Sequence, residues 1–179
     1  MRSNMKVVAL FLLFAPSVFA QNNAGAAYSC GPPNVQFDVK KDNSQHSIGQ
    51  PEAGKALVYV IEVFQRPPGE LGTPTIRVGL NGAWIGANRG TSYLFFSVEP
   101  GEYHLCTNWQ SSLKRLSDQH SLTNFIAEAG KTYFFRVQTH VQTNSVGGEV
   151  WSIQLEPVNP DEAKYLIATS PISISQAKK

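Results

Sequence analysis

The sequence has only two cysteines, Cys30 and Cys106, and its histidines and cysteines do not stand at the spacings that metal sites use. It lacks a Gly-x-Ser-x-Gly segment, typical of hydrolase nucleophiles, and a glycine-rich loop ending in Lys-Ser or Lys-Thr for phosphate. The acidic residues are scattered, so no pair of carboxylates indicates a glycosidase. We therefore expect no catalytic residues, no metal and no cofactor, and we expect that the protein is not an enzyme.

Long hydrophobic runs are also scarce, and the clearest one stands at the N-terminus. Arg2 and Lys6 come first, an apolar run from Val7 to Phe14 follows, and small residues lead to Ala20. This order is typical of a secretory signal peptide that is cleaved after Ala20. The run is shorter than the roughly 20 apolar residues of a membrane-spanning helix. We expect an exported protein, periplasmic or extracellular, with no transmembrane segment.

Net charge gives no reason to expect nucleic acid or an anionic membrane as a partner. Of the 15 basic residues, Arg2 and Lys6 leave with the signal peptide, so 13 basic residues face 13 acidic ones. The remaining basic pairs, such as Lys40-Lys41 and Lys114-Arg115, are short and separate, whereas phosphate binding uses a clustered basic face. We interpret these pairs as solvated surface.

About 159 residues remain after the signal peptide, which suits one domain with a hydrophobic core. We expect residues 21–29 to be a disordered lead-in, 30–170 to form the domain and 171–179 to be a tail. In an oxidising compartment, Cys30 and Cys106 are candidates for a disulfide. Two buried thiols or a redox pair are the alternatives, although the Cys-x-x-Cys spacing of redox pairs is absent.

Short β-rich runs alternate with turn-forming residues throughout the domain. Nine runs are predicted strands: residues 35–40, 56–64, 75–80, 83–87, 93–98, 103–107, 122–127, 132–141 and 151–156. The run 56–64 is apolar at almost every position, as in a central strand covered on both sides. Asn81-Gly82 predicts a two-residue hairpin turn, and 99–102 and 129–131 predict further tight connections.

A helix is predicted near the C-terminus. Asn159 can cap it, Pro160 suits its first position, and Asp161 and Glu162 suit the positive end of the helix dipole. The segment 110–120 is compatible with either a helical turn or an irregular loop. Regular short strands with one late helix predict an all-β, antiparallel β-sandwich of the immunoglobulin-like or PEGA-like type.

Several segments resemble a known family when taken in order. They are Gly54 to Val60, Val78 to Gly86, Ser92-Tyr93, Glu99 to Leu105 and Ala129 to Phe134. Together they resemble the bacterial family catalogued as domain of unknown function 2846, over roughly residues 54 to 156. The Pro-Gly-Glu-Tyr turn is also similar to the signature of PEGA surface modules. The resemblance implies a secreted or envelope β-sandwich without established catalytic residues. The stretches 66–74 and 110–120 depart from the family's usual pattern.

Aromatic residues are the candidates for ligand contact. Trp84 closely follows a predicted hairpin turn and stands near Asn88 and Arg89, a layout that can stack on a sugar ring or grip a protein. Trp109 leaves its strand for a polar loop and could act likewise. The alternative is that Trp84, Trp109 and Trp151 are core or core-edge residues, as most tryptophans are.

The leading hypothesis is a non-catalytic secreted or cell-envelope module that binds a protein or a surface component. A carbohydrate-binding module that uses Trp84 or Trp109 is the first alternative. The second is a hydrolase with a site near Glu102, His104 and His140, although we favour the interpretation of these residues as ordinary polar residues on the wet face of a sheet.

Overall fold

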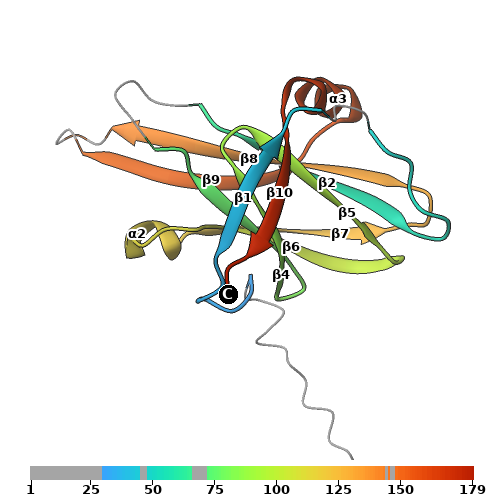
Figure 1. The fold of residues 1–179 in the computed structure, drawn as a ribbon, viewed down its shortest axis with the longest axis horizontal. Coiled ribbons are helices and arrows are strands. Elements are labelled where there is room, and N and C mark those ends of the chain that lie inside the picture. The colour runs from blue at the N-terminus through green and yellow to red at the C-terminus, as the bar shows by residue number, and fades with distance from the viewer. Residues whose placement is uncertain (1–29, 45–47, 66–71, 144, 146–147) are drawn as a thin grey trace, which may run out of the picture.

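The computed structural model describes residues 30–179 except 45–47, 66–71, 144 and 146–147. The expected signal peptide (1–20) and lead-in (21–29) therefore lie outside the described residues. Within them, the chain forms ten strands in two sheets and two short helices (Figure 1). No helix in this part of the chain has the length and apolar character needed to cross a bilayer.

The larger sheet has six strands and mixed directions. Its order is β1 (Phe37–Asp42), β10 (Ile172–Ala177), β5 (Ser92–Val98), β2 (Ala56–Val63), β8 (Thr132–Thr143) and β9 (Glu149–Pro157). β2 runs parallel to β8, and β10 runs parallel to β5. The prediction of a purely antiparallel fold is therefore wrong for this sheet. The parallel pairs join strands far apart in sequence, which a pattern of local turns does not reveal.

The smaller sheet has four antiparallel strands. Its order is β4 (Ala83–Arg89), β3 (Thr75–Leu80), β6 (Gly101–Trp109) and β7 (His120–Ala127). Asn81 and Gly82 join β3 to β4 with φ angles of 50° and 81°, as the predicted hairpin turn requires. The segment 110–120 contains a helical turn, α2 (Lys114–Ser117).

Two of the predicted tight connections cross between the sheets. The residues after Val98 lead from β5 in the six-stranded sheet to β6 in the four-stranded sheet. Residues 128–131 lead back from β7 to β8, and the Gly130 N–H donates to Lys55 O at 2.8 Å. These connections place segments from distant parts of the sequence at the same end of the fold.

The main hydrophobic core lies between the sheets. Val58 and Val60 of β2 pack there with Ile76 and Val78 of β3 and with Leu105 of β6. A second cluster lies on the opposite face of β2, under α3 (Pro160–Thr169), and contains Leu57, Tyr59, Ile61, Ala163 and Ile167. β2 is therefore covered on both sides, and the prediction of a central buried strand is confirmed.

The C-terminal residues complete the six-stranded sheet. Asn159 caps α3 as predicted, because its side chain accepts from the N–H groups of Asp161 and Glu162 at 3.1 and 2.9 Å. Residues 171–179, expected to be a tail, contain β10, which pairs with all of β1. Figure 1 shows β1 and β10 crossing in front of the other strands.

Candidate functional site

A hollow of about 340 Å³ opens at the end of the fold where β2 and β6 finish and β3 begins. We call it the aromatic hollow. Its apolar walls are Phe64, Pro74, Trp109, Leu113, Leu116 and Trp151. These residues come from both sheets and from α2, so the hollow exists only when the two layers pack together.

Ring contacts hold the walls of the aromatic hollow in place. Trp109 and Trp151 meet edge to face, with ring centroids 6.1 Å apart. Phe64 stacks on Trp151 with centroids 6.5 Å apart. Trp109 is only 3% exposed and belongs to the core between the sheets. A wall made from rigid, packed rings suits a preformed ligand site.

Two polar groups at the aromatic hollow have no partner among the described residues. The Nε1–H of Trp109 is buried and has no hydrogen-bond acceptor in that part of the chain. The exposed guanidinium of Arg115 makes no ion pair with any residue described. By contrast, the side chain of Gln110 is already used, since it donates to Phe37 O and accepts from Phe37 N.

Polar side chains are also buried between the sheets. Glu62 of β2 and Ser92 of β5 are cross-strand partners, and both are fully buried. Asn88 of β4 is fully buried and Thr139 of β8 is 6% exposed. We call these four residues the polar cluster. Both carboxyl oxygens of Glu62 and the Asn88 Oδ1 have no partner among the residues described.

The environment of Glu62 favours its neutral form. Burial raises the pKa of this carboxyl well above its ordinary value, although Lys41 and the Gly90 backbone oppose the change. Lys41 directs its Nζ to Thr91 O at 3.0 Å, and the Gly90 N–H donates to Pro74 O at 2.9 Å. Neither group is therefore dedicated to the carboxyl, and desolvation has the larger effect.

The structure separates the predicted ligand-binding residues from one another. The Asn88 side chain is turned inward and donates to Val60 O at 3.0 Å, whereas Arg89 is exposed. Trp109 lines the aromatic hollow, and Trp84 lines a different hollow of about 410 Å³ beside Cys30. The four residues therefore do not converge on one ligand.

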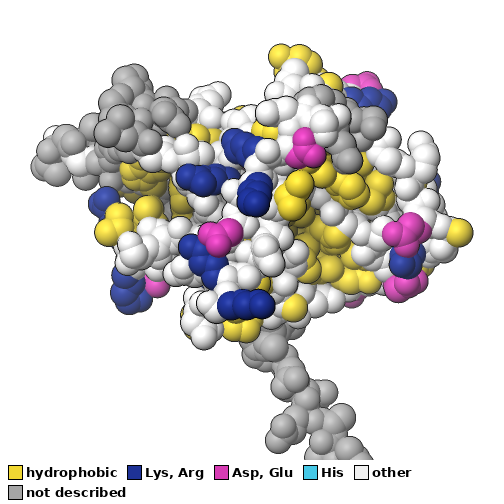
Figure 2. Space-filling model, in the orientation of Figure 1, with side chains coloured by type: hydrophobic (Ala, Val, Ile, Leu, Met, Phe, Trp, Pro, Cys, Tyr) yellow, Lys and Arg dark blue, Asp and Glu magenta, His cyan; other side chains and the backbone are white. Residues whose placement is uncertain are grey.

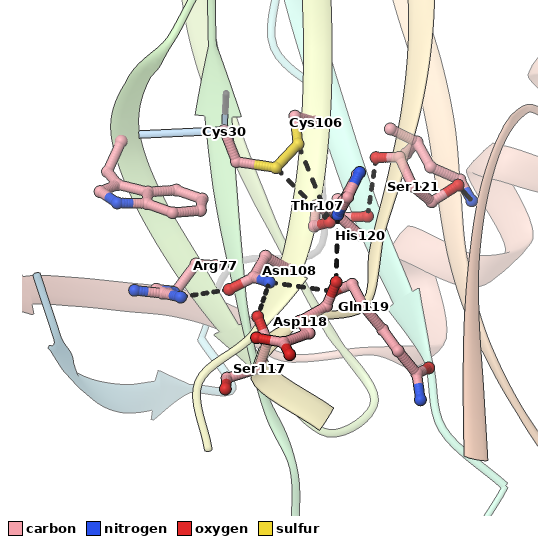
Figure 3. Close-up of a disulfide and its surroundings, with 12 residues drawn as sticks. Cys30, Arg77, Cys106, Thr107, Asn108, Ser117, Asp118, Gln119, His120 and Ser121 are labelled. Atoms are coloured by element: carbon pink, nitrogen blue, oxygen red, sulfur yellow. Dashed lines mark hydrogen bonds between the residues drawn. A yellow bond between two sulfur atoms is a disulfide. The ribbon is translucent and has the colours of Figure 1, made fainter. Parts of the chain in front are cut away.

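The disulfide between Cys30 and Cys106 holds the start of the domain against the outer face of β3 and β6 (Figure 3). The Cα atoms of the two cysteines are 5.2 Å apart. A Cβ on Gly79 would lie 2.0 Å from Cys30 O, so only glycine allows the segment to approach so closely. The predicted disulfide is confirmed.

Arg77 fastens the same segment through its guanidinium. Its Nη1 donates to Pro33 O at 3.1 Å and to Val35 O at 2.8 Å. Its Nη2 donates to Asn108 Oδ1, as Figure 3 shows. The guanidinium carbon also lies 4.4 Å from the ring centroid of Trp84, whose Nε1–H donates to Pro32 O at 2.7 Å. We interpret this region as a structural clasp, because most of its donors are engaged.

The residues of the alternative hydrolase site do not assemble. His104 lies on β6 of the four-stranded sheet and contacts Asn124 Oδ1 through Nδ1 at 2.7 Å. His140 lies on β8 of the other sheet. Alternation along each strand turns both histidines away from the core between the sheets, so they face opposite sides of the molecule.

Hydrophobic and basic side chains are segregated on the face that carries β1 and β10. Figure 2 shows hydrophobic side chains grouped below α3 and Lys and Arg side chains grouped along β1. Phe95 of β5 and Ile174 of β10 are 44% and 54% exposed on this outer face. The exposed hydrophobic area extends the cluster under α3 to the surface.

Sequence reasoning missed several of these residues. Glu62 is the one acid inside the apolar run 56–64, and Arg77 is the one charge inside the strand 75–80. For both Glu62 and Arg77, the sequence signal was a single charged residue within a strand that is otherwise apolar or uncharged. Phe64 and Arg115 carried no comparable signal, because their role depends on packing between distant segments.

The fold is a β-rich, two-sheet domain fastened by one disulfide. Residues 52–149 match the family described as Protein of unknown function (DUF2846), and because this match spans more than half of the sequence, the chain belongs to that family. The predicted resemblance is confirmed. No curated protein and no solved structure matches the chain.

Proposed function

We propose that the protein is a non-catalytic, exported binding module of the cell envelope, periplasmic or extracellular, and that its ligand occupies the aromatic hollow. In this proposal the two sheets are a sandwich of the PEGA-like or immunoglobulin-like type that acts as a rigid frame. The ligand is a component of the envelope.

The aromatic hollow is the observation that supports this proposal. Ligand sites are usually concave and mostly apolar, with a few polar groups that orient the ligand. Here Phe64, Trp109 and Trp151 supply the apolar walls, and the exposed Arg115, which makes no ion pair with any residue described, is a polar group at the same hollow.

Two further observations are consistent with a binding role outside the cytoplasm. The disulfide between Cys30 and Cys106 is the kind of bond that persists in oxidising compartments. His104 and His140 lie in different sheets, so the acid and base groups considered from the sequence do not form a pair. Neither observation names the ligand.

Capture from an envelope extract tests the proposal with matched variants. Leu113 lines the aromatic hollow and is 52% exposed, whereas Leu122 on β7 is 42% exposed and is not among the hollow's lining residues. Leu113→Glu places a charge at the hollow, and Leu122→Glu makes the same change elsewhere. We expect wild type and Leu122→Glu to retain the same component and Leu113→Glu to lose it. Equal retention by all three proteins would reject the aromatic hollow as the site.

The carbohydrate alternative is tested by titrating soluble glycans against tryptophan fluorescence. The Arg77 guanidinium lies over a face of the Trp84 ring, 4.4 Å from its centroid, and Trp109 is almost fully buried, so neither resembles an open sugar platform. We expect no response from a broad glycan panel. A response that Trp84→Phe abolishes would favour carbohydrate binding over the proposed function.

A further inference from the structure

We infer that the ligand of the aromatic hollow is a small amphiphilic anion, whose apolar part lies between Trp109 and Trp151 and whose negative group pairs with Arg115. This inference rests on the proposed function, since it names the chemical class of ligand for the same site. The size, the lining and the charge of the hollow each contribute to it.

The size of the aromatic hollow favours a small molecule. Its volume is about 340 Å³, close to the lower end of the range of ligand pockets, which is roughly 300–1,000 Å³. A protein partner would instead need a contact area of about 800 Å² on each side. The hollow therefore fits one compact ligand or one end of a short chain.

The lining of the aromatic hollow favours an apolar body. Phe64, Trp109 and Trp151 form one part of the wall, and Leu113 and Leu116 of the α2 region form another. Burying apolar surface there is favourable at about 25 cal/mol per Å². A fully polar ligand would leave these side chains without matching contacts.

The charge at the aromatic hollow favours an anion. Among the described residues that line the hollow, Arg115 is the charged one and no acid is found. The nearby acid Asp118 is paired with Lys114 at 2.5 Å and lines the hollow beside Cys30 instead. The Arg115 guanidinium, which has no ion-pair partner among the described residues, matches a carboxylate or a phosphate in geometry and charge. Electrostatic complementarity of this kind selects between ligands of similar shape.

Three probes of equal chain length test the inference by calorimetric titration of the intact mature protein. They are decanoate, decanol and decylammonium, each kept below the concentration at which it forms micelles. We expect decanoate to bind at least tenfold more tightly than decylammonium, with decanol between them. Arg115→Gln should reduce that ratio to less than threefold while decanol affinity stays unchanged. Lys114→Gln, a change of the same kind on the same helical turn, should leave all three affinities as in wild type.

The outcomes separate the inference from the proposed function. The inference that an anion pairs with Arg115 would be wrong if wild type bound the three probes equally or if the charge preference survived in Arg115→Gln. Either result would leave the aromatic hollow as a site. Absence of binding by all three probes would also overturn the inference. The proposed function would fail separately, if Leu113→Glu captured the same envelope component as wild type. Decyl phosphate in place of decanoate distinguishes a phosphate from a carboxylate as the preferred anion.

Discussion

Trp109 of β6 and Trp151 of β9 meet at an interplanar angle of 83°, and this contact is one of those that join the end of the four-stranded sheet to the edge of the six-stranded sheet. The same two rings line the aromatic hollow. The same pair of side chains therefore contributes both to packing between the sheets and to the shape of the candidate site.

Shortening Trp151 should lower stability and alter the aromatic hollow together. Trp151→Ala removes the ring that contacts both Trp109 and Phe64, so we expect a loss of about 2 kcal/mol or more in the free energy of unfolding. Urea denaturation measures the change. Val150→Ala is the matched control, because Val150 is 50% exposed and should change stability by less than about 0.5 kcal/mol. Equal effects of the two variants would contradict the packing described.

The pH dependence of stability should contain a contribution from Glu62. Its pKa is raised by folding, so the folded chain keeps a proton that the unfolded chain loses as pH rises above the ordinary value of 4.5. The contribution of Glu62 to stability therefore falls with rising pH until its folded pKa is passed, with a slope of at most about 1.4 kcal/mol per pH unit.

Glu62→Gln removes this dependence. We expect the variant to gain stability relative to wild type between pH 5 and 8 and to match it most closely at pH 4, where the wild-type carboxyl is protonated in both states. Urea denaturation at a series of pH values gives the two curves. Parallel curves would mean that folding does not raise the pKa of Glu62.

Loss of the disulfide should destabilise the domain strongly. Cys30 and Cys106 are separated by 76 residues, and closing a loop of this length stabilises a fold by about 4 kcal/mol in the chain-entropy model. The double variant Cys30→Ala/Cys106→Ala should therefore unfold at a much lower urea concentration. Reduced wild-type protein is the control and should behave like the variant. A change below about 1 kcal/mol would show that the bond contributes little.

Replacement of Arg77 by lysine should loosen the start of the domain. A lysine carries one ammonium group and cannot reproduce the fork that reaches Pro33 O, Val35 O and Asn108 Oδ1. We expect Arg77→Lys to lower the free energy of unfolding by about 2 kcal/mol. Arg89→Lys, at an exposed position of β4, provides the control with a change near zero. Faster hydrogen exchange at residues 34–36 in Arg77→Lys would identify the segment released.

Export remains a prediction from the sequence. If residues 1–20 are a signal peptide, the secreted or periplasmic protein begins at Gln21. Mass spectrometry of protein recovered from the periplasm and from the culture medium locates the N-terminus and the compartment. Recovery of uncleaved chain from the cytoplasm alone would reject this prediction.

Local patterns predicted most of the elements in this fold. Alternation and turn residues placed β3, the Asn81-Gly82 hairpin and the cap at Asn159 close to where they occur. β10 was missed because the short run from Ile172 to Ala177 follows a helix and ends in polar residues. The parallel pairing of β2 with β8 depends on crossovers between sheets, and no local pattern encodes them.

The candidate site was less accessible to prediction. Trp109 was singled out as a possible platform for a ligand, with a core position as the alternative, and the structure buries it against Trp151. Phe64 and Arg115 join it only because β2 and α2 finish at the same end of the fold. A site assembled from distant segments is determined by tertiary packing. The periodicity of a single strand predicts secondary structure but does not predict which distant segments meet.

The indole N–H resonances of the three tryptophans provide the most direct measurement on the aromatic hollow. Two-dimensional ¹H–¹⁵N spectra recorded with increasing decanoate should show large shifts for Trp109 and smaller ones for Trp151. The resonance of Trp84, whose N–H is held by Pro32 O, should stay in place. Shifts confined to Trp84, or spectra that do not change when decanoate is saturating by calorimetry, would contradict the assignment of the hollow as the binding site.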